Sequence, residues 1–293
     1  MIEPFSFRGR EFYLLRDDLL GDFNGNKARK LEYFLNADLS GFKRIVSHGS
    51  SQSNAMYSLS LFAKIKNLEF CYVVSHLSSN LKQNPVGNFK FALENGMKIF
   101  VAEDRVKFAK ELADTTDALF ISEGVAQSEA EYGFKTQADE ISAWSEKSGV
   151  RPDIFLPSGT GTSATYLAKH IDLNVFTCPC VGDAKYLREE ISGLDERSRV
   201  KILTPPKKYH FGDPKLELYE IWQELKAAGV EFELIYDPVG FITMFANLKE
   251  FKNEILYIHQ GGLLGNISQK MRYERKFKNY YINHTFKFVF YSD

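Results

Sequence analysis

Short apolar runs that alternate with helical periods constrain the fold of this chain more than any other feature. Between about residues 43 and 102, the apolar runs RIVSH, FCYVVS and MKIFVAED are separated by the helical stretches SNAMYSLSLFAKIKN and NPVGNFKFALENG. This alternation is typical of βαβ units and a parallel sheet. In the first helix Met56, Leu59, Phe62 and Ala63 recur at helical spacing, so we expect that face to pack on the sheet.

A second series of the same kind follows. Apolar runs such as DIFLPSG, NVFTCPC, VKILT, FELIYDP and EILYIHQGG alternate with helical stretches. Two series predict an α/β protein with two open, mainly parallel, twisted sheets in two lobes, and ligands are expected between them at the carboxyl ends of strands. We assign residues 1–38 and 122–293 to a large lobe and residues 39–121 to a small lobe inserted into it.

Composition and charge exclude several classes of partner. The chain has 293 residues with 37 basic and 38 acidic side chains, so no general positive field would attract nucleic acid or an anionic membrane. No stretch approaches the ~18 uninterrupted apolar residues of a membrane span, and no signal-peptide pattern opens the sequence. Cys71, Cys178 and Cys180 lie in apolar runs without metal-site spacing. We expect buried reduced thiols, no metal and a cytoplasmic protein.

The C-terminal stretch QKMRYERKFKNYYINHTFKFVFYSD mixes basic and aromatic residues. That mixture also occurs in proteins that bind single-stranded nucleic acid by charge and stacking. Phe286, Phe288 and Phe290 alternate as on a strand with one buried face. We therefore expect this segment to pack on the body of the protein or on another subunit, and not to bind nucleic acid.

The stretch IFLPSGTGTSATYLAKH is a candidate phosphate site. A strand ends at Leu156, and a helix begins near Ser163. Free N–H groups and the dipole at a helix start attract anions, and glycines let the backbone approach an anion closely. The residues of the loop are Ser158, Gly159, Thr160, Gly161, Thr162 and Ser163. An ordinary capped turn explains the local sequence equally well.

The stretch SHGSSQSNAMYS is a second loop between a strand and a helix. Its hydroxyl and amide groups are able to hold a small carboxylate without an arginine. The residues concerned are Ser50, Ser51, Gln52, Ser53 and Asn54. Taken alone, the stretch is better explained as a capped helix start.

Two further motifs, RDD at residues 16–18 and GNKARKLEY at residues 25–33, form a family pattern together with these loops. The chain resembles the family of 1-aminocyclopropane-1-carboxylate deaminase and D-cysteine desulfhydrase, which carries both motifs in this order. The resemblance continues through GSSQSN, SGTGTS, DPV and HQGG, and covers most of the chain. These proteins are pyridoxal 5'-phosphate enzymes of the tryptophan synthase β-like class. The resemblance implies that cofactor in the cleft between the lobes, a small amino acid as substrate, and a homodimer.

The resemblance also implies roles for single residues. Lys27 would form the Schiff base with the cofactor aldehyde, Lys30 would contact the phosphate in the SGTGTS cradle, and Asn54 would approach the ring hydroxyl. Ser53 would act near the substrate, whose carboxylate would rest on residues 50–54. The chemistry agrees, because a nucleophilic amine must be partly desolvated and near other cations, and Lys30 lies one helical turn from Lys27. Two solvent-facing lysines are the alternative.

The run YDPVGFITMF departs from the family pattern. Gly240 stands where the family has a tyrosine, and Phe241 where it has the partner of the pyridine nitrogen, for which Thr243 is the nearest substitute. Phe211 replaces a second family tyrosine. Acid–base help is commonly worth ~10²–10⁴ in rate, so efficient cyclopropane ring opening is disfavoured. Replacement proton donors could be Tyr209, His210, Tyr236 or His259, although we expect all four to be structural.

The sequence therefore predicts a pyridoxal phosphate enzyme that acts on a small amino acid by deamination or β-elimination. β-Elimination from a D-amino acid and other chemistry of the same cofactor stay open. Two alternatives remain: a cofactor-binding homologue with weak or no catalysis, and an α/β binding protein without the cofactor.

Overall fold

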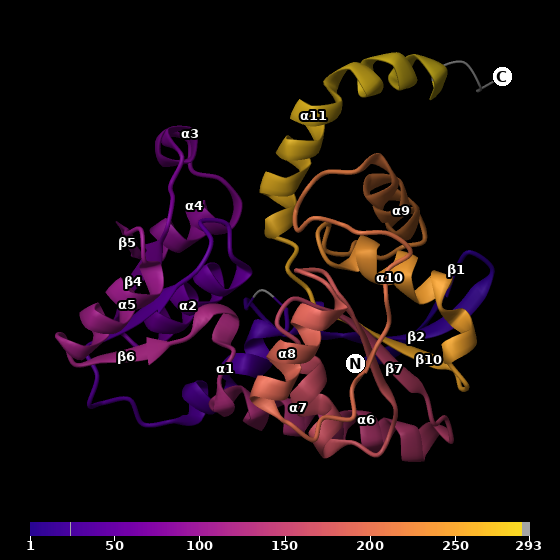
Figure 1. Cartoon of the computed structure of the whole chain (residues 1–293), viewed down its shortest axis with the longest axis horizontal. Coiled ribbons are helices and arrows are strands. Elements are labelled where there is room, and N and C mark those ends of the chain that lie inside the picture. Colours follow the sequence, from indigo (N-terminus) through magenta and orange to yellow (C-terminus); the bar gives the residue numbers. More distant parts are fainter. Residues whose placement is uncertain (24, 289–293) are drawn as a thin grey trace.

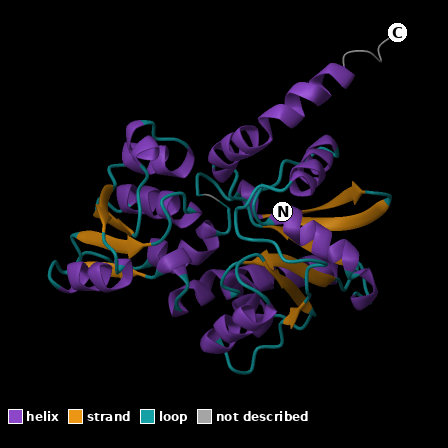
Figure 2. Ribbon diagram, turned by 45° about the horizontal axis from the view of Figure 1, so that its top comes forward, coloured by secondary structure: helices purple, strands orange, loops and turns teal. Residues whose placement is uncertain are grey.

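Two sheets, each covered by helices, organise the chain (Figures 1 and 2). The computed structural model describes residues 1–23 and 25–288, with side chains as far as Lys278. Most neighbouring strands are parallel, which confirms the predicted α/β class with two mainly parallel sheets. Within the described residues, no helix is both long enough and apolar enough to cross a membrane.

The smaller sheet has four parallel strands. In spatial order they are β5 (Lys98–Val101), β4 (Glu69–Val74), β3 (Arg44–His48) and β6 (Ala118–Ile121). Phe70 and Tyr72 of β4 pack in the cluster with α2 (Asn54–Ile65) and α4 (Gly87–Glu94), whereas Cys71 and Val73 pack with α5 (Arg105–Asp114). The alternation follows from the two-residue period of a strand that is buried on both faces.

The predicted stripe of α2 is confirmed. Met56, Leu59, Phe62 and Ala63 are at most 1% exposed and belong to the core of the smaller sheet. Cys71, Cys178 and Cys180 are free and buried, as expected.

The larger sheet has six strands, of which only β1 runs antiparallel to its neighbour. In spatial order they are β1 (Ile2–Phe7), β2 (Arg10–Arg16), β10 (Ile255–His259), β7 (Asp153–Ser158), β8 (Val175–Pro179) and β9 (Lys201–Ile202). α6 (Glu131–Ser148) and α7 (Thr162–His170) share one core with this sheet, and α9 (Leu216–Ala227) and α10 (Asp237–Ala246) share another. The helix predicted from about Ser163 to His170 is thus confirmed as α7.

The remaining elements connect or flank the two sheets. α1 (Lys27–Asn36) contacts both α6 and α2, and in Figure 1 it lies between the sheets. The others are η1 (Asp17–Leu19), α3 (Ser79–Gln83), η2 (Glu123–Val125), η3 (Ser128–Ala130), α8 (Ala184–Leu194), η4 (Leu248–Glu250) and α11 (Gly265–Phe288).

Two expected strands are not present. The run FELIYDP is a turn that leads into α10, because its backbone N–H groups bind carboxylates: Ile235 and Tyr236 donate to Glu233, and Glu233 donates to Asp237. The backbone at residues 286 and 288 is helical and belongs to α11, so the alternating strand is wrong there. Residue 290 and the side chains of all three phenylalanines lie outside the described part of the chain.

Candidate functional site

Lys27 is the first residue of α1. Its ammonium donates a hydrogen bond of 2.8 Å to the side-chain oxygen of Asn26. Burial lowers the pKa of Lys27 from 10.5 to about 8, although the charge of Glu233 opposes this change. A useful fraction of the amine is therefore neutral near physiological pH, and this is the form that attacks a carbonyl carbon.

Asn26 joins Lys27 to the larger sheet. Its amide nitrogen donates to the Ser163 hydroxyl at 3.1 Å and to the side-chain oxygen of Gln260 at 2.8 Å. Its backbone N–H donates to the Gln260 carbonyl at 2.7 Å. The backbone segments around Gly25 and Gln260 lie very close together. A β-carbon on Gly25 would be only 1.8 Å from that carbonyl oxygen, so only glycine fits there. The GNKARKLEY and HQGG motifs are therefore in direct contact.

An ion-pair cluster fixes the start of α1, and it is buried at Arg29 and Asp17 but exposed at Glu140. Arg29 is 4% exposed and pairs with Asp17 at 3.0 Å and with Glu140 at 2.6 Å. Gln137 donates to Asp17 at 2.7 Å. Burial raises the pKa of Asp17 to about 6 even though Arg29 lowers it. Asp17 of the RDD motif therefore helps to orient the helix that carries Lys27.

The loop after β7 forms an open helix start. β7 ends at Ser158, and Gly161 takes a left-handed backbone conformation (φ 74°) as the N-cap of α7. No side chain of the described residues caps this helix, so its first N–H groups face the loop. The hydroxyls of Thr160 and Thr162 lie 2.8 Å apart. Free N–H groups, hydroxyls and a helix dipole together form a suitable phosphate site.

The loop after β3 acts in part as the N-terminal cap of α2, which is the simpler explanation of its sequence. Ser53 is the N-cap of α2, and its hydroxyl oxygen accepts from the Ala55 N–H at 3.1 Å. Asn54 accepts a hydrogen bond of 2.7 Å from Asn88. Ser50 is exposed, whereas Ser51 and Gln52 are half-buried. The Ser53 hydroxyl also lies beside the hydroxyl of the buried Tyr72, whose pKa it lowers against the effect of burial.

Lys30 points at a carbonyl group. It is 4% exposed and donates to the Gly124 carbonyl at 2.8 Å. Burial, and then the charge of Lys27, hold the pKa of Lys30 well below its usual value. The loop that carries Gly124 is strained, because Val125 has a φ of 55°, which is unusual for a β-branched residue. Lys30 thus lies beside Lys27, and its expected contact with a phosphate stays a prediction.

Comparison with solved structures identifies the architecture. The chain matches an ACC deaminase homologue with 24% identity and a TM-score of 0.71 over 90% of this chain and 88% of the other. It matches a threonine deaminase from T.th. with 18% identity and a TM-score of 0.65, over 87% and 88% of the two chains. It matches a pyridoxal 5'-phosphate-dependent aspartate racemase with 16% identity and a TM-score of 0.63, over 89% of each chain.

The chain has the tryptophan synthase β-like fold. No protein-family model matches the sequence, and a search of curated proteins found no match either. The shared architecture is that of fold type II pyridoxal phosphate enzymes, and it places the loops described above at carboxyl ends of strands, where such folds bind ligands.

Close packing around Tyr257 explains why Gly240 and Phe241 fit at these two positions of the tryptophan synthase β-like fold. A β-carbon on Gly240 would lie 2.8 Å from the Tyr257 hydroxyl and 3.2 Å from Pro157. The Phe241 ring stacks on Tyr257 with centroids 4.3 Å apart, and it is fully buried. Thr243 donates its hydroxyl proton to the Val239 carbonyl at 2.7 Å. A packed aromatic core therefore fills the position, and Thr243 is not a substitute for the missing polar group.

The suggested proton donors differ in their surroundings. His259 is fully buried, donates from Nε2 to the Glu231 carbonyl at 2.9 Å and accepts at Nδ1 from Gly261 at 3.1 Å. It is therefore structural. The Tyr236 hydroxyl lies 3.4 Å from where a β-carbon on Gly159 would be, and its ring contacts Phe211 at 5.5 Å. Tyr236 thus lies beside the loop that follows β7.

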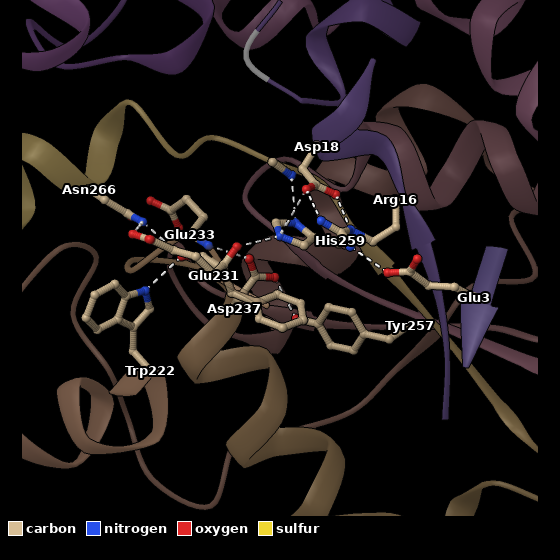
Figure 3. Close-up of polar contacts among 12 residues, drawn as sticks. Glu3, Arg16, Asp18, Trp222, Glu231, Glu233, Asp237, Tyr257, His259 and Asn266 are labelled. Atoms are coloured by element: carbon tan, nitrogen blue, oxygen red, sulfur yellow. Dashed lines mark hydrogen bonds and ion pairs between the residues drawn. The ribbon is translucent and has the colours of Figure 1, made fainter. Parts of the chain in front are cut away.

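Sequence reasoning missed Glu233. This carboxyl is 2% exposed and lies close enough to Lys27 for each charge to act on the other. Burial raises the pKa of Glu233 to about 8, against hydrogen bonds from the backbone N–H groups of Tyr236 and Ile235. A glutamate inside the apolar run FELIYDP was the available signal, because a buried charge requires a partner. Figure 3 shows Glu233 beside Asp237 and Asn266.

Proposed function

We propose that this chain is a pyridoxal 5'-phosphate-dependent enzyme that acts on a small amino acid by deamination or β-elimination. One observation carries the proposal: the desolvated Lys27 amine, with its pKa lowered to about 8, is linked through Asn26 to Ser163 at the start of α7. A nucleophilic amine thus lies one side chain away from a helix start suited to a phosphate. A pyridoxal 5'-phosphate-dependent racemase of the same fold supports the choice of cofactor.

The donor set of this chain fits the cofactor. Lys27 would hold its aldehyde, Asn54 its ring hydroxyl and Lys30 its phosphate. The remaining phosphate contacts would come from the loop after β7, namely Ser158, Gly159, Thr160, Gly161, Thr162 and Ser163. The uncapped start of α7 and the hydroxyls of Thr160 and Thr162 support this assignment. When bound, the cofactor would supply an electron sink for the substrate carbon that loses a proton.

The protein itself would bind the substrate and move protons. Lys27 would take a proton from the substrate carbon and return it, and its lowered pKa in the free protein supports this role. Ser53 would act near the substrate, and the Ala55 N–H already fixes its hydroxyl oxygen. Ser50, Ser51 and Gln52 would hold the substrate carboxylate beside it.

The missing tyrosines favour β-elimination over ring opening. Gly240 and Phe211 leave two acid–base positions unfilled, and each such group is commonly worth ~10²–10⁴ in rate. D-Cysteine should therefore release sulfide faster than 1-aminocyclopropane-1-carboxylate releases ammonia. Equal or reversed rates would refute this choice of reaction.

The proposed function is tested by the absorbance of the purified protein. Bound pyridoxal phosphate should give a band at longer wavelength than the protein's own aromatic residues, and Lys27→Ala should abolish that band while circular dichroism stays unchanged. Lys30→Ala is tested beside it, since it removes the neighbouring amine, which is assigned to the phosphate, from the same helix. Loss of the band in Lys30→Ala together with its survival in Lys27→Ala would show that the two roles are assigned wrongly.

A cofactor-binding protein with little catalysis is the second candidate. It is favoured by the aromatic packing of Phe241 and Tyr257, which fills one acid–base position with apolar groups. A panel of D- and L-amino acids decides between the two. An enzyme should change the absorbance band with at least one of them and release a product, whereas the second candidate should retain an unchanged band throughout.

A further inference from the structure

The carboxyl group of Glu233 has one satisfied and one unsatisfied oxygen. Oε2 accepts from the Ile235 N–H at 2.7 Å and from the Tyr236 N–H at 2.6 Å. Oε1 is buried and has no hydrogen-bond partner among the described residues. Asp237, four residues on, is different: one of its oxygens accepts from the Tyr257 hydroxyl and the other from the Glu233 N–H. Of these two carboxyl groups, only Glu233 therefore has an oxygen that lacks a donor within the part of the chain that the structure describes.

That oxygen lies among the residues proposed to hold the cofactor. A β-carbon on Gly262 would lie 2.8 Å from Cγ of Glu233 and 2.8 Å from the amide nitrogen of Asn54. A β-carbon on Gly265 would lie 3.2 Å from the Asn54 side-chain oxygen and 3.6 Å from Oε1 of Glu233. The carboxyl group and the Asn54 amide thus share one side of the loop that follows β10, and Lys27 is near enough to interact with that charge.

A buried carboxylate oxygen without a donor is costly, so such a group is expected to meet a proton donor or a cation. None of the described side chains supplies one to Oε1. Burial is the main reason why the pKa of Glu233 is raised, and the like charge of Asp237 raises it further. The N–H groups of Tyr236 and Ile235 partly offset both effects. A protonated ring nitrogen brought in by a ligand would satisfy the oxygen.

We propose that Glu233 holds the pyridine nitrogen of the cofactor and takes the place of the polar residue that Phe241 has replaced. This inference rests on the proposed function. A carboxylate beside the pyridine nitrogen keeps the nitrogen protonated, and a protonated ring withdraws electrons more strongly. Phe241 and Thr243 cannot serve, because one is apolar and packed on Tyr257 and the other donates to its own helix.

The experiment compares Glu233→Gln with Glu231→Gln. Glutamine keeps the shape of Glu233 and an oxygen for the N–H groups of Ile235 and Tyr236, but removes the charge. Glu231 is the matched control, since it lies two residues away and pairs with Lys226 and Lys270 at the surface. Pyridoxal 5'-phosphate is titrated into each cofactor-free protein and followed by absorbance, and the melting temperature of each cofactor-free protein is recorded.

We expect E233Q to bind the cofactor at least roughly tenfold more weakly, as the loss of a charge-assisted hydrogen bond predicts. E231Q should bind as the wild type does, and cofactor-free E233Q should melt no lower than the wild type. Glu233→Asp, which keeps the charge one methylene further back, should lie between E233Q and the wild type. These results together support the assignment, and the absorbance band of bound E233Q should also be shifted.

Three results would overturn it. E233Q could bind with wild-type affinity and spectrum, or E233D could bind no better than E233Q. Alternatively, cofactor-free E233Q could melt well below the wild type, which would make Glu233 a structural cap of its own turn. In all three the wild type still binds the cofactor, so the proposed function survives. A wild-type protein that takes up no cofactor refutes the proposed function and this inference together.

Discussion

The Lys27 ammonium donates a hydrogen bond to the side chain of the residue before it, Asn26, and this bond orients the amine. The same asparagine donates to Ser163, which is 137 residues away in the sequence. One amide therefore connects the start of α1 to the start of α7. It fixes the distance between the nucleophile and the proposed phosphate site without using a charged group, so the amine keeps its lowered pKa.

Replacement of Asn26 should weaken the cofactor site. In Asn26→Ala the Lys27 amine loses its acceptor and the Ser163 link, and each lost hydrogen bond costs about 1 kcal/mol. We expect cofactor affinity to fall by roughly tenfold in an absorbance titration. Asn36→Ala, at the exposed far end of α1, should have no such effect, since the one hydrogen-bond partner of that side chain among the described residues is the Glu32 carbonyl. Equal affinity of the two variants would contradict the role given to Asn26.

The lowered pKa of Lys27 predicts unusual reactivity in the cofactor-free protein. Half of its amine should be neutral at a pH of about 8, whereas an ordinary lysine requires a pH near 10.4. Labelling with an amine-reactive reagent, followed by mass spectrometry of the Lys27 peptide, should show a rate that is half-maximal at a pH of about 8 and levels off roughly one pH unit higher. A rate that keeps rising to pH 10 would show that burial does not lower this pKa.

Loss of Arg29 should destabilise the protein strongly. Arg29→Gln leaves Asp17 buried without its cation, and breaking a buried pair in this way costs about 3–5 kcal/mol. Arg8 and Glu224 form a matched exposed pair, with both side chains 46% exposed, so Arg8→Gln should cost at most about 1 kcal/mol. The free energy of unfolding in urea measures both. Similar losses in the two variants would mean that the Arg29 cluster is not buried as described.

The contact between Gly240 and Tyr257 predicts non-additive substitutions. Gly240→Ala places a methyl group 2.8 Å from the Tyr257 hydroxyl, and overpacking of this kind costs about 1–3 kcal/mol. In a Tyr257→Phe background that oxygen is absent, so the same Gly240→Ala change should cost less. A double-mutant cycle of unfolding free energies gives the coupling. Strictly additive effects would show that the Tyr257 hydroxyl does not limit the space beside Gly240.

Local sequence was sufficient for the elements whose faces are set by their own periodicity. The stripe of Met56, Leu59 and Phe62 identified α2 and its buried side, since helical spacing alone places those residues on one face. The strand and helix around the loop after β7 were predictable for the same reason. The turn at FELIYDP was not, because its apolar residues resemble a strand while the carboxyl groups of Glu233 and Asp237 bind the backbone that a strand would need.

The sequence by itself thus determined the α/β class, the alternation of strands and helices between residues 43 and 102, and the amine placed at a helix start, because these follow from patterns within a few turns of chain. Only the tertiary structure decided that Asn26 reaches Ser163, that Lys30 bonds to the Gly124 carbonyl, and that Glu233 lies beside Asn54. Those contacts join segments far apart in the chain. Burial then sets the charge of each group, and burial depends on how the sheets and helices pack together.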